Sequence, residues 1–278
     1  MDLLDLHAGL LPIHLKIDKQ CHRAATRIAT LLPTHPLYKP AKKCTARAVK
    51  WHASPLHKLM STYRINPKET ECIRVALHNP VMIHNRPFSV RISTSKETSA
   101  LEDQQATEKV RVYSDGSSHD GEVGAVAILI REGEPTQKLH YHLGLSSQHT
   151  VYEAELIGIL LGLHLIKTDK KSRTSYLIRV DNQAALSALN GVKNTSCQYI
   201  TDMILTTATQ IKKSRKSPSY SLKFRWMVGH TSIAGNKEVD KEAKKAVEGM
   251  TSCKSSLPPL LRKKIKNNKS ALKQHKRE

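Results

Sequence analysis

The chain has 278 residues, enough for one domain of ordinary size with appended segments or for two small domains. Its net charge of +21 favours a polyanionic partner such as nucleic acid, with a merely soluble basic surface as the alternative. The five cysteines form no Cys-x-x-Cys pair and no apolar run reaches the roughly 18 residues of a membrane span, which argues against a disulfide framework, a zinc finger and a membrane protein.

Residues 1–92 are expected to form a helical or irregular, connection-like segment without a large core. Apolar residues recur every three or four positions across residues 12–32, which predicts an amphipathic helix. Four basic residues fall on or near its other face: Lys16, Lys19, Arg23 and Arg27. Solvation is the usual explanation of such a face, and phosphate contact is the alternative. The polar residues 93–107 that follow are expected to be a linker.

Residues 108–250 show the clearest pattern and are expected to form one α/β domain. The first strand begins near Lys109 and ends at Ser114–Ser117, and further strands are expected at 123–130, 138–143, 176–180 and 221–228. Helices are expected at 150–167, 182–189, 197–213 and 236–248. Three successive strands followed by alternation predict a mixed sheet with helices on both faces. Residues 251–278, with nine basic and one acidic side chain, are expected to be a disordered basic tail.

Four carboxylates stand at positions where such a sheet places its chemistry. Asp115 is expected to end the first strand and Asp181 the fourth, and functional sites in α/β folds border strand ends. Glu155 lies early in the helix after the third strand, and Asp240 lies in the last helix, ten residues after His230. Each has a structural alternative when taken alone, since Asp181 could cap the helix that follows it. Together they form the oxygen-ligand set that two Mg²⁺ ions about 4 Å apart need for phosphodiester hydrolysis.

Four short motifs resemble the signatures of type 1 ribonuclease H. They are Ser114–Ser117 (Ser-Asp-Gly-Ser), Ala154–Leu156 (Ala-Glu-Leu), Val180–Gln183 (Val-Asp-Asn-Gln), and Gly229–His230 with Asp240. The resemblance implies a ribonuclease H-like fold with a five-stranded mixed sheet and dependence on Mg²⁺ or Mn²⁺, with two ions expected. It also implies endonucleolytic cleavage of the RNA strand of an RNA–DNA hybrid, which leaves 3′-hydroxyl and 5′-phosphate ends.

The resemblance also assigns residue roles. The metal-ligand and catalytic positions are those of Asp115, Glu155, Asp181 and Asp240. His230 takes the place of a mobile histidine that assists proton transfer or product release, and a satisfied loop histidine is the structural alternative. Glu153 competes with Glu155, but the family's glutamate directly precedes leucine, which selects Glu155. Glu153 is then a residue of the helix start that adds negative potential.

Substrate contacts are suggested by position alone. Ser117, Thr150 and Gln183 resemble groups that touch the backbone or minor groove of the hybrid, although hydroxyl-bearing residues are common on any surface. The long basic handle of the family is absent. Lys212–Lys216 could supply part of that charge, and a solvated helix end favoured by the helix dipole is the alternative.

The flanking segments resemble fungal non-LTR retrotransposon polyproteins. Leu31–Leu37 and Trp51–Leu56 are similar to the segment between reverse transcriptase and ribonuclease H, and Leu257–Gln274 is similar to the tail of the same elements. No polymerase-type Asp-Asp motif occurs in the chain. The resemblance therefore implies the C-terminal end of such a polyprotein, without polymerase activity.

The expected partners are an RNA–DNA hybrid at the site and nucleic-acid backbone along the basic tail, with no membrane contact. Free thiols and the lack of a basic leader favour an intracellular protein, in the nucleus or the cytoplasm, and we expect a monomer. One alternative is a retrotransposon remnant that binds nucleic acid without cutting it. The other is a DNA-cutting transposase or resolvase, which shares the sheet but generally places the last carboxylate differently.

Overall fold

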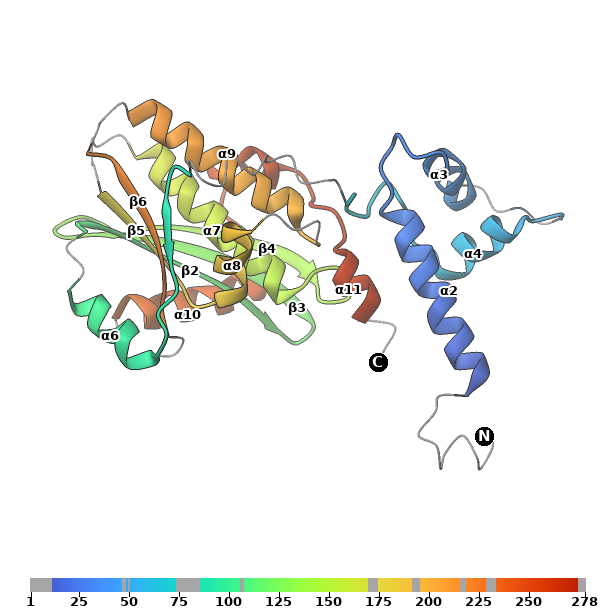
Figure 1. Cartoon of the computed structure of the whole chain (residues 1–278), viewed down its shortest axis with the longest axis horizontal. Coiled ribbons are helices and arrows are strands. Elements are labelled where there is room, and N and C mark those ends of the chain that lie inside the picture. The colour runs from blue at the N-terminus through green and yellow to red at the C-terminus, as the bar shows by residue number, and fades with distance from the viewer. Residues whose placement is uncertain are drawn as a thin grey trace. The chain divides into compact units, whose positions relative to one another are not determined.

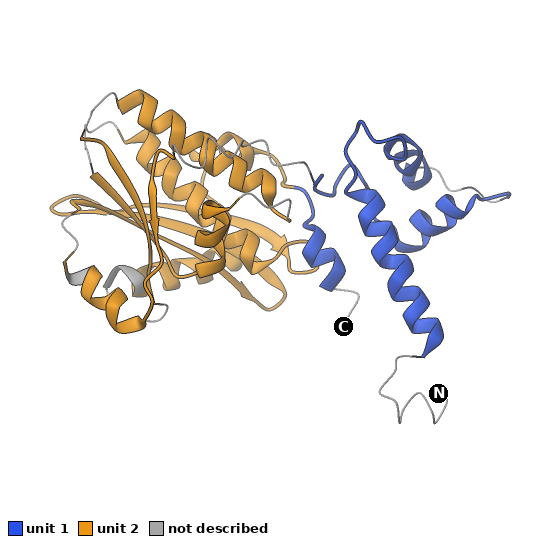
Figure 2. Ribbon diagram, in the orientation of Figure 1, with its two compact units in different colours: residues 1–74, 266–278 blue, residues 75–265 orange. Residues whose placement is uncertain are grey.

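The chain divides into two compact units (Figure 2): a smaller unit of residues 1–74 and 266–278, and a larger unit of residues 75–265. The computed structural model describes residues 12–46, 49, 51–73, 86–105, 108–169, 175–191, 196–215, 219–228 and 234–274. No helix within these ranges combines the length and the apolar character of a membrane span.

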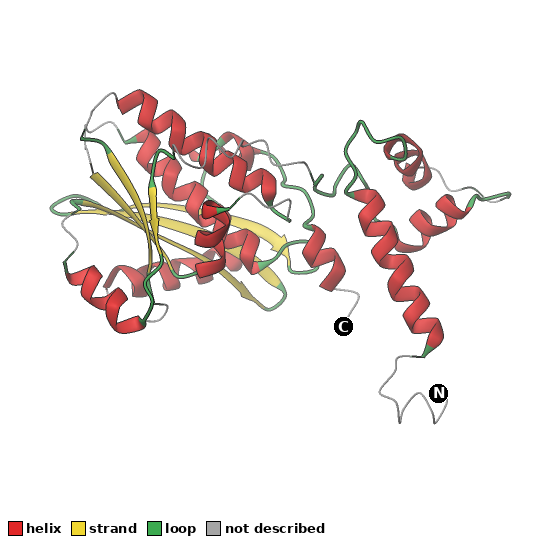
Figure 3. Cartoon of the chain, in the orientation of Figure 1, coloured by secondary structure: helices red, strands yellow, loops and turns green. Residues whose placement is uncertain are grey.

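A six-stranded mixed sheet forms the centre of the larger unit as described (Figures 1 and 3), in the order β1-β6-β5-β2-β3-β4. The strands are β1 (Ser89–Arg91), β2 (Val110–His119), β3 (Glu122–Arg131), β4 (Gln137–Leu145), β5 (Ser175–Val180) and β6 (Ser221–Trp226). Strands β2, β3 and β4 are antiparallel neighbours, whereas β5 runs parallel to both β2 and β6. The mixed α/β sheet predicted from the sequence is therefore confirmed.

The sequence predicts five strands, and the structure adds β1 at the edge of the sheet. Ser89–Arg91 pairs in parallel with Lys223–Arg225 of β6. Next to this strand, Phe88 packs edge-to-face on Phe224, with the ring centroids 4.9 Å apart. Three residues carry too short a pattern to predict a strand. Strand β1 forms by pairing with β6, which lies far along the chain, so the local sequence does not indicate it.

Helices cover both faces of the sheet (Figure 1). Those of the larger unit are α6 (Lys96–Gln104), α7 (Val151–Thr168), α8 (Gln183–Asn190), α9 (Gln198–Arg215) and α10 (Ala234–Val247), with short 3₁₀ turns η1 (Lys254–Ser256) and η2 (Pro259–Arg262). Helix α7 lies between the sheet and α9 and is buried along most of its length. On the opposite face, Val239 and Ala243 of α10 pack against Tyr113, Val126 and Ile128.

Glycines let both faces of the sheet contact helix backbone directly. A Cβ added at Gly116 of β2 would clash with the backbone N of Glu155 and lie 2.6 Å from the carbonyl C of Ala154. On the other face, a Cβ at Gly124 of β3 would lie 2.5 Å from the carbonyl C of Ala246 in α10. Since no side chain fits at such separations, these two glycines allow the close spacing of the three layers.

Two segments of the larger unit differ from the sequence-based expectation of a linker and a disordered tail. Helix α6 lies inside the expected linker, and the Ser99 hydroxyl donates to the Trp226 carbonyl oxygen at 3.1 Å. In the tail, Leu257, Leu261 and Ile265 are buried in the main core. These three apolar residues recur every four positions and so form one apolar side of the tail. The high overall charge of the tail outweighs this pattern in a prediction based on composition.

The smaller unit contains helices α2 (Ile13–Ala29), α3 (Tyr38–Ala46), α4 (Pro55–Tyr63) and α11 (Lys269–Gln274). The helix predicted across residues 12–32 is confirmed as α2. The unit has a small core of its own, which consists of Ala25, Ala29, Ala41, Cys44, Met60 and Ile65. Residues from the tail join it because Asn267 pairs with Thr70 in a parallel bridge.

The close contact at Gly116 can be tested by adding a methyl group. Gly116→Ala is expected to lower the free energy of unfolding by about 1–3 kcal/mol, because the methyl group would force α7 away from β2. Urea unfolding measures this change. Gly191→Ala is the matched control, since Gly191 has a φ of −124° and the nearest atom to an added Cβ lies 3.9 Å away. Equal destabilisation by both substitutions would contradict the packing explanation.

Candidate active site

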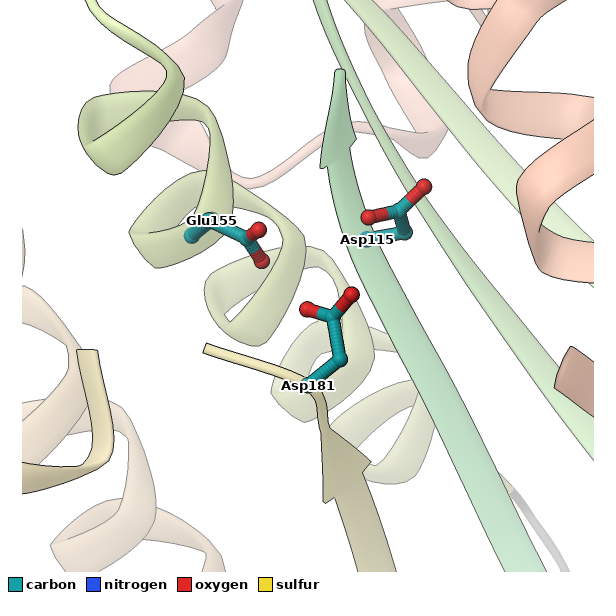
Figure 4. A group of neighbouring side chains, drawn as sticks. All are labelled: Asp115, Glu155 and Asp181. Carbon is teal, nitrogen blue, oxygen red and sulfur yellow. The ribbon is translucent and has the colours of Figure 1, made fainter. Parts of the chain in front are cut away.

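Three acidic side chains of the larger unit lie close together and form what we call the acidic group (Figure 4): Asp115, Glu155 and Asp181. Each offers one carboxylate oxygen, and these three oxygens all lie within 4.8 Å of one another. Asp115 comes from β2, Glu155 from α7, and Asp181 is the residue that directly follows β5. The fold thus brings together carboxylates from three separate segments of the sequence.

Asp115 lies within β2, whereas the sequence predicts it at a strand end. The strand continues to His119 because it pairs with β3 throughout, with Asp115 opposite Val126. Side chains alternate along a strand, so Asp115 and Ser117 share one face while Gly116 faces α7. A half-buried Ser117 is therefore placed on the same side of β2 as the carboxylate.

Helix α7 separates the roles of its two glutamates. The Glu153 carboxylate is fully buried, with Oε2 at 3.0 Å from His149 Nδ1 and Oε1 accepting from the Tyr199 hydroxyl at 3.1 Å. Glu155 lies two residues later, about 200° around the helix, and its carboxylate joins Asp115. The geometry therefore places Glu155, the residue that the motif selects, in the acidic group. The Glu153 carboxylate instead makes hydrogen bonds inside the fold.

The residue before α7 has a clear local role. The Thr150 hydroxyl oxygen accepts a hydrogen bond from the Glu153 backbone N at 3.2 Å and so caps the helix. The sequence proposes Thr150 as a substrate contact, and the structure shows its oxygen in this capping bond. Capping also fixes the start of the helix two turns or less from Glu155, which keeps that carboxylate in position.

Asn182 decides the role of its neighbour Asp181. Asn182 Oδ1 accepts from the Ala185 backbone N at 3.0 Å and caps α8, so the alternative in which Asp181 caps this helix is wrong. The Asp181 carbonyl oxygen accepts from Trp226 Nε1 at 2.9 Å, which ties the end of β5 to β6. The Asp181 carboxylate faces Glu155 and Asp115 (Figure 4).

The acidic group is electrostatically strained without a cation. Burial raises the pKa of Glu155 well above its ordinary value, and the charges of Asp181 and Asp115 raise it further, while a hydrogen bond with Asn182 opposes the rise. Glu155 Oε2 is buried and has no hydrogen-bond partner among the described residues. A divalent cation would offset the repulsion and coordinate this oxygen, so the residues fit Mg²⁺ or Mn²⁺.

The other predicted site residues are not all gathered here. Asp240 lies on α10, half-buried, and is not part of the three-residue group that the described residues form. Gln183 is exposed as the first residue of α8. His230 lies outside the described residues. Sequence reasoning missed Asn182 as a cap, although it stands inside the motif, and Tyr199, for which no local pattern gives a signal.

One family model matches more than half of the chain. The ribonuclease H family model matches residues 107–248. Among solved structures, the chain is similar to LC11-RNase H1, determined in complex with an RNA/DNA hybrid, with 17% identity, coverage of 51% of this chain and 98% of that chain, and a TM-score of 0.39. It is also similar to RNase H1 from the halophilic archaeon Halobacterium salinarum NRC-1, with the same identity and coverages and a TM-score of 0.35. The curated proteins contain no match.

The strain in the acidic group predicts that neutralising Glu155 stabilises the metal-free protein. A raised folded-state pKa means that the contribution of Glu155 to stability is greatest below its unfolded pKa and is lost as the pH rises through the folded value. Glu155→Gln should therefore raise the thermal unfolding midpoint in chelator at neutral and mildly alkaline pH. Added Mg²⁺ should raise the midpoint of the wild type more than that of the variant.

Glu153→Gln is the matched control for this experiment. It alters a carboxylate that is hydrogen-bonded to His149 and Tyr199, and it should lower the unfolding midpoint. If Glu155→Gln were the less stable of the two in chelator, the repulsion among the three carboxylates would not limit stability.

Proposed function

The chain belongs to the ribonuclease H family, and from this we propose that it hydrolyses the RNA strand of RNA–DNA hybrids endonucleolytically, with two divalent metal ions. The observation that carries the proposal is the convergence of Asp115, Glu155 and Asp181 within 4.8 Å, inside the residues that the family model matches. Carboxylate oxygens are the ligands that hard divalent cations prefer. A cluster of this kind is the expected support for metal-assisted phosphodiester hydrolysis.

The protein's own part in this chemistry is to hold oxygen ligands in fixed positions. When bound, Mg²⁺ or Mn²⁺ would activate the attacking water and stabilise the leaving oxygen, which leaves 3′-hydroxyl and 5′-phosphate ends. Asp115 is held by the pairing of β2, and Glu155 is held by the buried helix α7. Asp181 is held where β5 ends against Trp226. Rigid strands and a buried helix keep the ligands aligned without reorganisation during the reaction.

Asp240 is proposed as the fourth carboxylate. Tyr113 packs against Val239 and Ala243 of α10. Asp115 lies two residues after Tyr113 and therefore on the same face of β2. Asp240 directly follows Val239, so the carboxylates of Asp115 and Asp240 both border the layer in which β2 packs against α10. His230, ten residues before Asp240, is proposed to assist proton transfer or product release.

Substrate binding is proposed to use surfaces beside the acidic group. Ser117 shares the face of Asp115, and Gln183 is exposed immediately after the segment that carries Asp181. Thr150 is retained as a proposed contact through its hydroxyl hydrogen. In the tail, Arg262–Lys264 is exposed between the buried Leu261 and Ile265, which supports contact with nucleic-acid backbone there.

The origin and setting of the chain are part of the proposal. The flanking segments 31–37, 51–56 and 257–274 support a chain related to the C-terminal end of fungal non-LTR retrotransposon polyproteins. We propose an intracellular monomer with a connection-like segment to residue 92 and a ribonuclease H domain at residues 108–250. Residues 93–107, which include α6, join the two, and the tail that follows residue 250 packs in part on the main core.

Cleavage of a labelled RNA–DNA hybrid by the full chain tests the activity. We expect cleavage in Mg²⁺ or Mn²⁺ and none in chelator, and we expect Asp115→Asn to lower the rate by about 10³-fold or more, because a metal ion contributes several kcal/mol. Equal cleavage by the wild type and by Asp115→Asn would contradict the proposal. Preferred cleavage of duplex DNA would favour a transposase-like activity, and salt-sensitive binding without turnover even in Mn²⁺ would favour a non-catalytic remnant.

A pair of substitutions on α10 tests the fourth carboxylate. Asp240→Asn should lower kcat at least about tenfold, because it removes a metal-binding charge next to the reacting phosphate. Glu238→Gln is the control on the same helix, where Glu238 pairs with Lys138 at 2.7 Å at the surface, and it should leave kcat nearly unchanged. An unchanged kcat in Asp240→Asn would remove Asp240 from the site.

A further inference from the structure

Helix α2 of the smaller unit carries a line of positive charge. Its members are Lys16, Lys19, Arg23 and Arg27. Their spacing of three and four residues places them within about 80° of the helix circumference and over roughly 16 Å of its length. None of the four has an ion-pair partner among the described residues. The one acid of α2, Asp18, accepts from the Tyr63 hydroxyl at 2.7 Å and lies on a different side of the helix.

This line of charge is not needed to pack the unit. The buried side of α2 consists of His22, Ala25, Thr26 and Ala29. Like charges at i and i+4 repel one another, so Lys19, Arg23 and Arg27 cost stability in the free protein. An anionic partner that spans several turns of the helix would offset this cost.

The line of charge ends at a preformed pocket. The pocket has a volume of about 580 Å³ and is lined by nine residues, none of them acidic. Three of the nine carry basic groups: Arg27 from α2, His35 from the following loop and Lys269 from the start of α11. Leu31, Pro36 and Ile73 contribute apolar walls. The pocket therefore extends the positive surface of α2 with a cavity that is both basic and apolar.

Backbone hydrogen bonds hold the walls of the pocket together. Ile73 N donates to the Thr30 carbonyl oxygen at 3.0 Å, which ties the segment around Ile73 to the end of α2. Glu71 N donates to the Asn267 carbonyl oxygen at 3.0 Å, and Glu71 Oε1 accepts from Lys269 N at 2.7 Å. Three segments distant in sequence are thus joined, so the cavity exists before any ligand binds.

We propose that the α2 basic surface, which is Lys16, Lys19, Arg23, Arg27 and Lys269, binds the sugar–phosphate backbone of a nucleic-acid strand. This is a second nucleic-acid site, separate from the carboxylates, and its relevance to hybrid cleavage rests on the function proposed above. A row of cations over several helical turns matches the repeating charge of a polynucleotide better than it matches a single phosphate group. The pocket with apolar walls suits a sugar or base beside its phosphate.

An anionic membrane is the competing partner, because Ile13 and Ile17 are exposed on α2. The pocket argues against it. Its basic groups Arg27 and Lys269 border an open hollow between three segments, which suits a narrow strand better than a flat lipid surface. Nucleic acid is therefore the occupant that the geometry favours.

Binding to a labelled RNA–DNA hybrid with a single-stranded RNA extension tests the proposal. Every protein is the full chain with Asp115→Asn, in chelator, so that binding is measured whether or not the wild type cleaves. Fluorescence anisotropy across a salt series should show that Lys16→Gln/Arg23→Gln and Arg27→Gln/Lys269→Gln each weaken binding about tenfold or more. Each pair should also reduce the slope of log K against log salt by about two, one for each lost phosphate contact.

The matched control is Lys43→Gln/Lys58→Gln, which removes two exposed charges from α3 and α4, neither of which lines the pocket. Unchanged binding in both α2 pairs, or an equal loss in the control pair, would overturn the proposal. The proposal would also be overturned if the α2 pairs lost binding to phosphatidylserine vesicles while their hybrid binding persisted. A circular dichroism melt checks folding, and the exposed single variant Arg27→Gln, with an expected slope change of about one, serves where a pair unfolds.

Discussion

The direct contact between α7 and the backbone of β2 is the constraint on which the site depends. Gly116 leaves room for the backbone of Ala154 and Glu155, and Gly158 on the helix would place a Cβ only 3.2 Å from the Asp115 carbonyl oxygen. A larger residue at either position would separate the layers. Because the backbones touch, a short glutamate side chain reaches the aspartate of the strand, and three carboxylates meet within 4.8 Å.

This closeness has an electrostatic cost that the protein avoids elsewhere. Burial and the neighbouring Asp181 and Asp115 raise the pKa of Glu155. Glu242 of α10 is also buried, and burial raises its pKa, but hydrogen bonds from Lys245, His140 and Lys138 outweigh this effect and lower the pKa to about 2. Glu242 thus has two lysines beside it, whereas Glu155 has two aspartates beside it. Such an arrangement persists where a cation supplies the missing charge.

The net charge of +21 means that many basic residues also lack an acid to compensate them. Positive residues are paired where they support the fold, as in Arg131 with Asp169 at 2.9 Å, both nearly buried. On α2 they form a row without an ion-pair partner among the described residues, and the acid of that helix, Asp18, lies on a different side. A like-charged row costs stability in the free protein, so it is best explained by a polyanion that binds there.

Local pattern determined much of this protein. Periodicity predicted α2, α7 and the main strands, and the residues around Asp115, Glu155 and Asp181 predicted the acidic group, because both signals depend on neighbours in the chain. The tertiary structure alone decided the edge strand β1, the burial of Leu257 in the tail and the choice of Asn182 over Asp181 as the helix cap. It also decided the pocket, which joins α2 to Ile73 and Lys269. These features rest on contacts between distant segments, whose burial and hydrogen bonding no local pattern specifies.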